Sequence, residues 1–127
     1  MTGEAVTAVR ATPLADLVRT YYDNIDAGDV PAALACFAST AVYRRPGYPA
    51  LVGRAAIEAF YAATRVVGPG RHSIEVTVED GDEVAVRGRF DGTRTSGEAL
   101  NVRWADFWRV ADGRVVERNS YFDAPVA

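Results

Sequence analysis

The sequence predicts a single α+β domain, with its helices in the first half of the chain and an antiparallel sheet in the second. In the first half, apolar residues recur at steps of three and four, the spacing typical of amphipathic helices. In the second half, apolar and polar residues alternate, and Asp-Gly pairs typical of hairpin turns separate the runs. A length of 127 residues fits one domain. Helices and strands that are segregated in this way pack with the helices on one face of the sheet.

The composition is that of a globular protein, and it limits the partners that we expect. Apolar residues make up 49% of the chain and charged residues 24%, the usual balance for a chain that buries a core. The net charge of -3 argues against a nucleic-acid partner. We find no apolar run long enough to cross a membrane and no secretory leader, so we expect a cytoplasmic protein with no membrane partner.

Few chemistries are open to this composition. All 14 residues in the lysine and arginine class are arginine, which excludes Schiff-base catalysis by a lysine amine. The chain has a single cysteine, Cys36, and a single histidine, His72, and these two cannot supply a zinc site. We therefore expect no metal and no cofactor, and we expect any catalysis to use carboxylates, tyrosines and arginines.

The first part of the chain predicts an arm and two helices. Residues 1–11 show no periodic pattern, and we expect a flexible arm there, ahead of one domain that spans 12–127. Pro13 is typical of a first helical turn, and the apolar spacing that follows continues to Gly28. Asp29 then has the character of an N-cap for a second, short helix.

The remaining elements follow in order. A strand is expected at 40–45, and then a loop at 46–53 in which proline and glycine are frequent. A third helix is expected after Gly53, and the Gly-Pro-Gly segment at 68–70 is expected to end it. The alternating pattern then predicts four strands, at 72–79, 83–91, 98–110 and 114–122.

The strand at 98–110 carries the most informative local pattern. Alternation places Trp104, Asp106 and Trp108 on one of its faces. A carboxylate between two tryptophans is at least partly removed from water, and ionisable groups in such surroundings cluster at functional sites. The alternative is a structural aspartate paired with an arginine, and this strand alone does not decide between the two.

The neighbouring strands supply candidate partners for this carboxylate. Arg87, Arg89 and Asp91 share one face of the preceding strand, and Arg118 and Ser120 share one face of the last strand. An arginine-bearing face on an antiparallel sheet is ordinarily the exposed face. Periodicity does not decide which face of the sheet is concave.

Three segments of the chain resemble the ketosteroid isomerases. They lie at 21–29, 53–61 and 105–115 and read YYDNIDAGD, GRAAIEAFY and ADFWRVADGRV. More broadly, residues 12–124 resemble the nuclear transport factor 2-like superfamily, which includes SnoaL-like polyketide cyclases and limonene epoxide hydrolases. The resemblance implies a cone-shaped, curved antiparallel sheet wrapped around a long N-terminal helix, with two further helices, a pocket between helix and sheet, and a homodimer formed through the outer face of the sheet. It is less specific for the reaction, because this fold hosts many activities.

The resemblance carries over only part of the ketosteroid isomerase site. The oxyanion-hole tyrosine of those enzymes matches Tyr21, their oxyanion-hole aspartate matches Asp106, and a supporting tyrosine matches Tyr61. Their proton-shuttling aspartate falls on Arg45, so the base is missing. Steroid isomerisation by the known route is therefore not expected.

The other relatives carry over less. The arginine of the epoxide hydrolases matches Arg87 and one of their tyrosines matches Tyr43, but their two aspartates fall on Arg89 and Ser120. In the cyclases, the pocket histidine falls on Asp106 and the catalytic aspartate on Ser120. No mechanism of the superfamily transfers intact. The resemblance does imply which side chains face the pocket: Arg89, Asp91, Trp104, Asp106, Arg118 and Ser120.

We expect a small-molecule pocket protein, and the leading hypothesis is an isomerase or cyclase that uses acid–base chemistry on a carbonyl-bearing, polyketide-like or steroid-like metabolite. Tyr21 would donate a hydrogen bond to a substrate oxygen, and Asp106 would transfer a proton or complete the oxyanion hole. Asp106 is expected to be ionised, because Arg89 and Arg118 should outweigh its burial. The candidate substrate-binding residues are Tyr43, Arg45, Tyr61, Arg87, Arg89, Trp104, Arg118 and Ser120. The alternatives are a non-catalytic ligand-binding protein of the same fold and an epoxide-hydrolase-like enzyme with an altered site.

Other aromatic residues are expected to be structural. Tyr22, Phe37, Phe60 and Trp108 have the helical or strand spacing of core residues. His72 stands at the start of a strand and is expected at the surface or at an edge of the sheet.

Overall fold

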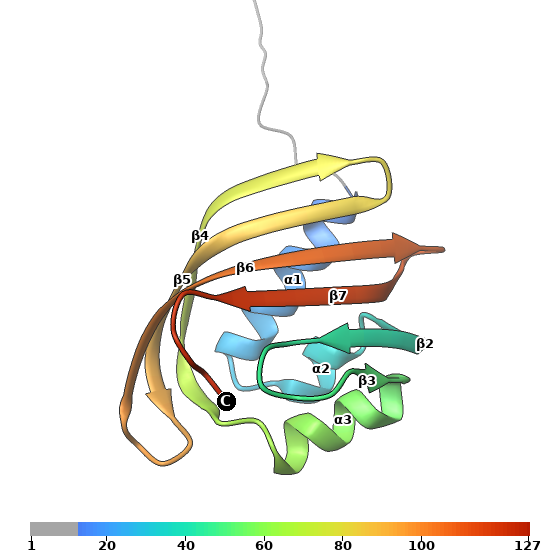
Figure 1. Ribbon diagram of the computed structural model, residues 1–127. Coiled ribbons are helices and arrows are strands. Elements are labelled where there is room, and N and C mark those ends of the chain that lie inside the picture. The colour runs from blue at the N-terminus through green and yellow to red at the C-terminus, as the bar shows by residue number, and fades with distance from the viewer. Residues whose placement is uncertain (1–12) are drawn as a thin grey trace, which may run out of the picture.

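The computed structural model describes residues 13–127, and it confirms the α+β class (Figure 1). The arm predicted at 1–11 lies outside the described residues. The elements are α1 (Pro13–Asp26), α2 (Val30–Leu34), β2 (Phe37–Arg44), β3 (Leu51–Val52), α3 (Arg54–Ala63), β4 (Val67–Asp80), β5 (Glu83–Arg94), β6 (Ala99–Ala111) and β7 (Arg114–Phe122). No helix between residues 13 and 127 is long and apolar enough to cross a bilayer.

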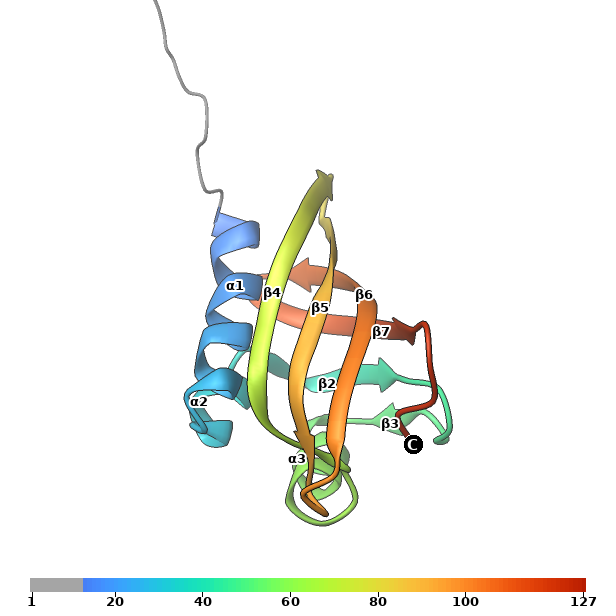
Figure 2. The ribbon, with the colours of Figure 1, turned by 90° about the vertical axis from the view of Figure 1, so that its left-hand side faces the viewer.

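The strands form one curved sheet of six strands in the order β3-β2-β7-β6-β5-β4. Neighbouring strands are antiparallel except β2 and β7, which pair in parallel. The sheet bends around α1, which contacts β4 and β5, while α3 packs on β2 and β3 (Figures 1 and 2). Helices therefore cover the concave face of the sheet, and none of the helices within residues 13–127 covers the convex face.

Helix α1 points its tyrosines at the sheet because of their spacing. Tyr21 and Tyr22 are each only 2% exposed, and they lie on the apolar stripe that the three- and four-residue steps create. Gly28, just after the helix, has a φ of +80°, the left-handed conformation that commonly ends helices. The side chain of Asp29 then accepts a hydrogen bond from the backbone N–H of Ala32 at 3.1 Å and caps α2, as predicted.

The beginning of β4 differs from the sequence-based prediction. The Gly-Pro-Gly segment at 68–70 does not end a helix but lies inside β4. This strand is at the edge of the sheet, where a proline that lacks an N–H leaves no ladder partner unpaired. A Cβ atom on Gly70 would overlap the ring of Phe90 on β5, so glycine permits this close approach. The segment Leu51–Val52, predicted as part of a loop, forms a short strand against β2.

Alternation along β5 and β6 separates the concave face from the convex face. On β6, Trp104, Asp106 and Trp108 are buried under α1, whereas Phe107 is exposed on the other side. The register pairs Val86 of β5 with Asp106, so these two side chains share the concave face. The predicted set of two tryptophans and one carboxylate therefore faces the interior.

Candidate functional site

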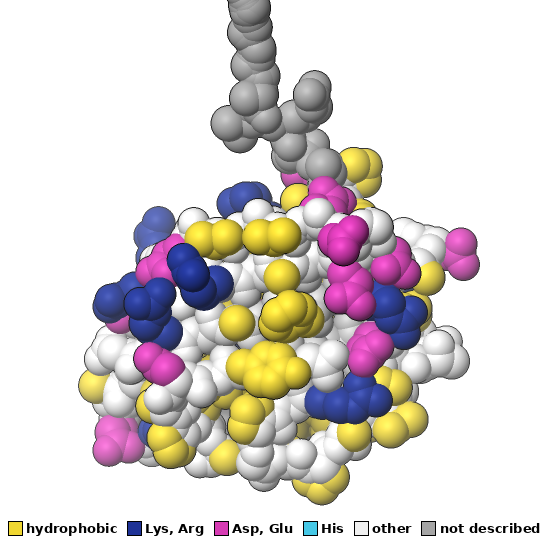
Figure 3. Space-filling model, turned by 45° about the horizontal axis from the view of Figure 1, so that its top comes forward, with side chains coloured by type: hydrophobic (Ala, Val, Ile, Leu, Met, Phe, Trp, Pro, Cys, Tyr) yellow, Lys and Arg dark blue, Asp and Glu magenta, His cyan; other side chains and the backbone are white. Residues whose placement is uncertain are grey.

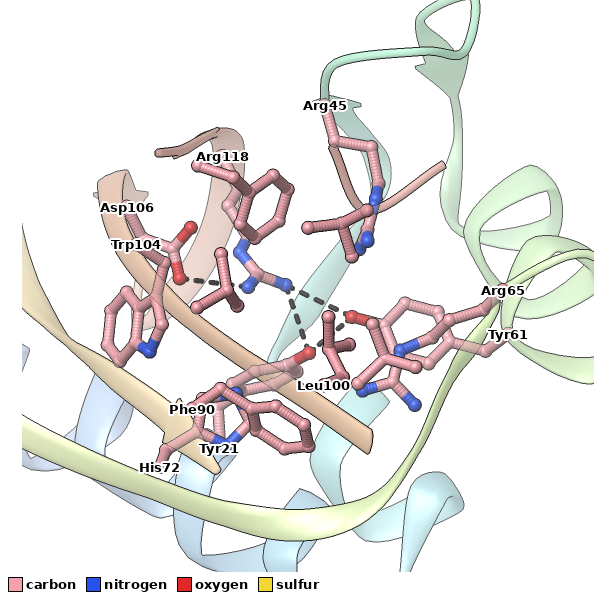
Figure 4. Close-up of a pocket in the computed structure, with 14 residues that line it drawn as sticks. Tyr21, Arg45, Tyr61, Arg65, His72, Phe90, Leu100, Trp104, Asp106 and Arg118 are labelled. Atoms are coloured by element: carbon pink, nitrogen blue, oxygen red, sulfur yellow. Dashed lines mark hydrogen bonds and ion pairs between the residues drawn. The ribbon is translucent and has the colours of Figure 1, made fainter. Parts of the chain in front are cut away.

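A small cavity lies where α1 and α3 meet the concave face of the sheet (Figure 4). Its lining includes Tyr21, Tyr61, His72, Trp104, Asp106 and Arg118. The free volume is about 30 Å³, which is room for roughly two water molecules. The deep pocket implied by the resemblance is therefore largely filled by the side chains that surround it.

A buried ion pair between Asp106 and Arg118 is the centre of the site. The two side chains are 3% and 6% exposed, and Arg118 Nη2 lies 2.9 Å from Asp106 Oδ2. The same carboxylate oxygen accepts a hydrogen bond from the hydroxyl of Tyr22, and Oδ1 accepts one from the hydroxyl of Ser120. A buried charge pair is tolerated when its remaining polar atoms are also hydrogen-bonded. Both oxygens of Asp106 are therefore already engaged.

The other end of the Arg118 guanidinium holds two phenols. Its Nη1 donates to the hydroxyl of Tyr21 at 3.0 Å and to that of Tyr61 at 3.1 Å, and the two hydroxyls also hydrogen-bond to each other (Figure 4). Only one of the two hydroxyls can donate in that last bond. The hydrogen of the other has no acceptor among residues 13–127, so it can be donated to a ligand.

The environment separates the acidities of the phenols. Burial raises the pKa of Tyr21, and the guanidinium of Arg118 opposes this only in part. Burial would also raise the pKa of Tyr61, but there the neighbouring arginines, Arg118 above all, prevail and the pKa lies below its ordinary value. Burial, together with the carboxylate of Asp106, raises the pKa of Tyr22 well above its usual range. Tyr61 is thus the strongest acid of these three phenols.

A second polar chain leads from Asp106 towards Arg45. The hydroxyl of Ser120 lies 2.8 Å from that of Tyr43, which accepts a hydrogen bond from Arg45 Nη1 at 3.1 Å. The guanidinium of Arg45 also lies over the ring of Phe60, 5.1 Å from its centroid. Arg45, which occupies the position of the missing isomerase base, is 7% exposed and lines the cavity as a cation.

The structure brings together eight of the ten predicted site residues and excludes two. Tyr21, Arg45, Tyr61, Trp104, Asp106 and Arg118 line the cavity, and Tyr43 and Ser120 join them through hydrogen bonds. The placement of Arg87 and Arg89 in the pocket is wrong. Both lie on the convex face, with side chains 57% and 53% exposed, as does Asp91, the ion-pair partner of Arg89.

The two-residue period of β5 explains why these arginines lie outside the pocket. Val84, Val86 and Phe90 are buried on the concave face, so the odd-numbered arginines between and beside them must face outward. The resemblance assigned the arginines to the pocket, whereas the ordinary expectation of an exposed arginine face is the one that the structure confirms. Asp106 therefore has one arginine partner, Arg118, and not two.

Two residues that sequence reasoning treated as structural belong to the site. Tyr22 is buried, as expected of a core residue, but its hydroxyl also donates to Asp106 and accepts from Trp108 Nε1 at 3.1 Å. His72 lies on β4, an edge strand, as one of the two expected alternatives had it, but its side chain is only 12% exposed, lines the cavity and places Nδ1 2.6 Å from Asp26 Oδ1. The sequence signal for Tyr22 was its place beside Tyr21 on one helix face. For His72, whose partner is 46 residues away in the chain, there was no local signal.

Solved structures of other proteins share this fold. A nuclear transport factor 2-like protein of unknown function from Burkholderia pseudomallei is 22% identical, with a TM-score of 0.79, over 88% of this chain and 92% of that one. TerC, co-crystallised with polyporic acid, is 22% identical, with a TM-score of 0.77, over 88% and 92%. A protein from Jannaschia sp. that bears the name of a SnoaL-like polyketide cyclase is 20% identical, with a TM-score of 0.76, over 93% and 90%. None of the curated proteins compared with the chain matches it.

At these identities the structural likeness shows the fold and not the reaction. The family assignment rests on a separate finding, the match of the chain to the sequence model of the SnoaL-like domain over residues 18–118. This match runs from α1 into β7 and includes both members of the Asp106–Arg118 pair. The chain therefore belongs to the SnoaL-like domain family.

Proposed function

We propose that this protein is an isomerase or cyclase that acts by acid–base chemistry on a carbonyl-bearing, polyketide-like or steroid-like metabolite. The observation that carries the proposal is the pair of phenols, Tyr21 and Tyr61, held at the cavity by one buried guanidinium. Hydrogen-bond donors fixed in a site with little water stabilise the negative charge that develops on a carbonyl oxygen during enolisation. Tyr61, the stronger acid, donates to that oxygen, and Arg118 supplies the positive charge behind it.

In this proposal Asp106 is a positioning residue. Both of its oxygens accept hydrogen bonds from side chains of the protein, which leaves it poorly placed to take a proton from a substrate. Its charge instead holds Arg118 at the angle at which Nη1 reaches the two phenols. The sequence predicted that Asp106 would transfer a proton or complete the oxyanion hole. We propose instead that it belongs to the site as the residue that positions Arg118.

Unpaired N–H groups support a ligand that is rich in oxygen. Within the described part of the chain, four buried N–H atoms have no hydrogen-bond partner, and their residues all line the cavity: Arg45 Nε, Arg65 Nε, Trp104 Nε1 and Arg118 Nε. Buried donors of this kind are nearly always satisfied in a working state, so acceptors supplied by a ligand would complete them. TerC, which shares the fold, was co-crystallised with polyporic acid, an observation in keeping with such a ligand.

A ligand larger than two waters needs the cavity to open, and the segment after β7 forms one of its walls. Val126 is 3% exposed and fills one side of the cavity, and Phe122 lines it as well. A hydrogen bond from Arg94 Nη2 to the carbonyl oxygen of Pro125, at 3.1 Å, ties this segment to β5. We propose that ligand entry displaces Val126 outward.

The test is the binding of 2-naphthol, with naphthalene as the neutral comparison and tryptophan fluorescence as the signal. Both tryptophans of the chain, Trp104 and Trp108, lie at the site. Tyr61→Phe should weaken 2-naphthol binding by roughly 10–100-fold, the value of one hydrogen bond to a charged or strongly polarised oxygen. Tyr121→Phe, on the exposed convex face, is the matched control and should leave binding unchanged. Equal binding by both variants, or equal binding of naphthalene and 2-naphthol, would refute the proposed role of the phenols.

The closed Asp106–Arg118 pair also favours a second candidate, a non-catalytic protein that only binds its ligand. The two candidates differ in whether they accelerate proton transfer. Exchange of the C1 hydrogens of 2-tetralone into D2O, followed by proton NMR, separates them. Acceleration above the protein-free rate supports the enzyme, and binding of the probe without acceleration supports the binding protein.

We further propose that two copies associate through the convex face of the sheet. Figure 3 shows hydrophobic side chains in the middle of one face with charged ones at both sides. Exposed apolar residues on the strands include Val78, Phe107 and Tyr121, at 56%, 44% and 55%, and the last two rings contact each other. Exposed apolar patches of this kind mark interaction surfaces. Phe107→Lys should convert a dimer to a monomer in light scattering, and a wild-type monomer at all concentrations would contradict the proposal.

A further inference from the structure

His72 and Asp26 form a second polar pair at the cavity, apart from the cluster around Arg118. His72 stands on β4 and Asp26 near the end of α1, and the imidazole Nδ1 lies 2.6 Å from Asp26 Oδ1. The other carboxylate oxygen, Oδ2, accepts the backbone N–H of His72 at 2.8 Å. The side chains are 12% and 23% exposed. Both oxygens of one carboxylate are thus used to hold one histidine.

This geometry determines which ring nitrogen is available. A carboxylate that accepts from Nδ1 places the hydrogen of the neutral imidazole on Nδ1, so the lone pair is on Nε2. The ring itself is fixed by Phe90, with centroids 4.9 Å apart, and by the edge of Trp104 at 5.5 Å. His72 lines the cavity, and its Nε2 makes no hydrogen bond to any residue of the described range 13–127. Figure 4 shows it beside Tyr21 and Phe90.

The cavity otherwise offers acids and cations. Tyr61, Arg45 and Arg118 are donors, and the carboxylate of Asp106 is engaged on both oxygens. Among the described residues that line the cavity, His72 Nε2 is therefore the one basic atom that is not already hydrogen-bonded. The reaction proposed above needs such an atom, because Arg45 stands where the isomerases carry their base.

We propose that His72 Nε2 is the general base of this site and that Asp26 is its positioning residue, an inference that rests on the proposed function. The C–H bond next to the substrate carbonyl breaks, its proton forms an N–H bond at Nε2, and the electron pair moves to the carbonyl oxygen to give an enolate. Tyr61 and Arg118 hold that enolate. Where a C=C bond adjoins the carbon that lost the proton, the enolate is conjugated with it; return of the proton from Nε2 to the far carbon of that bond shifts the double bond next to the carbonyl and gives an isomer. Attack of the enolate carbon on a second carbonyl of the same molecule closes a ring, and the alkoxide takes the proton from Nε2. The substrate class is therefore a ketone with an acidic adjacent C–H.

The first test measures exchange of the C1 hydrogens of 2-tetralone into D2O by variants of the full chain. His72→Ala should lower the exchange rate by roughly 100-fold or more, the usual contribution of a general base, and added imidazole should restore part of it. Asp26→Asn should lower the rate less, while Asp23→Asn, on the exposed side of the same helix, should leave it unchanged. Rescue by imidazole is the outcome that a merely structural histidine does not give.

The second test reads the histidine directly. Because His72 is the only histidine of the chain, nitrogen NMR of histidine-labelled protein shows a single imidazole. We expect the neutral ring to carry its hydrogen on Nδ1 in the wild type and to lose this preference in Asp26→Asn. A hydrogen on Nε2 in the wild type, or full exchange activity in His72→Ala, overturns the inference. The proposed function stands even if His72 is not the base, provided that Tyr61→Phe lowers the exchange rate or weakens 2-naphthol binding. Absence of exchange in the wild type overturns both.

Discussion

The ion pair between Asp106 and Arg118 can be measured by a double-mutant cycle that uses Asp106→Asn, Arg118→Met and the double variant. Both side chains are almost fully buried, so each single substitution leaves a charge in the interior without its opposite. Such a loss costs about 3–5 kcal/mol of unfolding free energy. For Arg118→Met we expect the lower end of this range, because Tyr22 and Ser120 still donate to the remaining carboxylate.

The double variant should be less destabilised than the sum of the two single variants. It buries neither charge, and the asparagine can still accept from one of the two hydroxyls through its amide oxygen and donate to the oxygen of the other through its NH2. We expect a coupling energy of about 2–3 kcal/mol, at the upper end of what contacting residues show. For a domain of 127 residues, a loss of about 3 kcal/mol corresponds to a fall in Tm of roughly 10–15 °C.

Urea unfolding followed by tryptophan fluorescence measures all four proteins, provided that the dependence on urea is the same for each. The control is the same cycle on Arg89 and Asp91, a pair 3.2 Å apart on the convex face with side chains 53% and 45% exposed. Exposed pairs are worth less than about 1 kcal/mol. Additivity of the Asp106 and Arg118 substitutions within about 0.5 kcal/mol would refute the view that this pair organises the interior.

Three further predictions follow from the surroundings of single residues. The pKa of Tyr61 is lowered in the folded state, so just below about pH 10 this phenol binds fewer protons in the native protein than in the unfolded chain. Its contribution to the unfolding free energy therefore increases as the pH rises through that window. Tyr61→Phe should remove that slope, together with the earliest phenolate absorbance in an alkaline titration. Burial raises the pKa of Cys36 to about 11, so its thiol should react with a disulfide reagent at pH 8 roughly 100-fold more slowly than in the unfolded chain. A Cβ on Gly88 would overlap the backbone carbonyl oxygen of Ser73, so Gly88→Ala should lower the unfolding free energy by about 1–3 kcal/mol in the same urea assay.

Much of the fold could be predicted because its elements carry strong local patterns. The apolar spacing of α1 and the alternation on β6 each define a buried face, and the structure confirms both. Tyr21 and Asp106 could be placed in one space because the resemblance to the ketosteroid isomerases assigned both buried faces to the pocket. The Asp-Gly turns at Gly81 and Gly113 also form as expected, each with a positive φ.

The rest depended on information that local patterns lack. Alternation divides β5 into two faces but does not show which one is concave. The resemblance supplied that choice, and it placed Arg87 and Arg89 on the wrong face. His72 pairs with Asp26 because β4 contacts α1 in the folded protein. The residue spacing within either element does not predict this contact. Pro69 was read as a stop signal, although the edge of a sheet tolerates a proline.

The position of β7 within the sheet has a consequence for how the chain reaches its native state. Because β7 separates β2 from β6, the unit of β2, β3 and α3 has no sheet to join until residues 114–122 are available. During synthesis, the meander of β4 to β6 can therefore form early, whereas the enclosure of the interior must wait for the final strand. Arg118 belongs to that strand and is the ion-pair partner of Asp106. Until that strand is in place, Asp106 has no arginine to balance its charge in the interior.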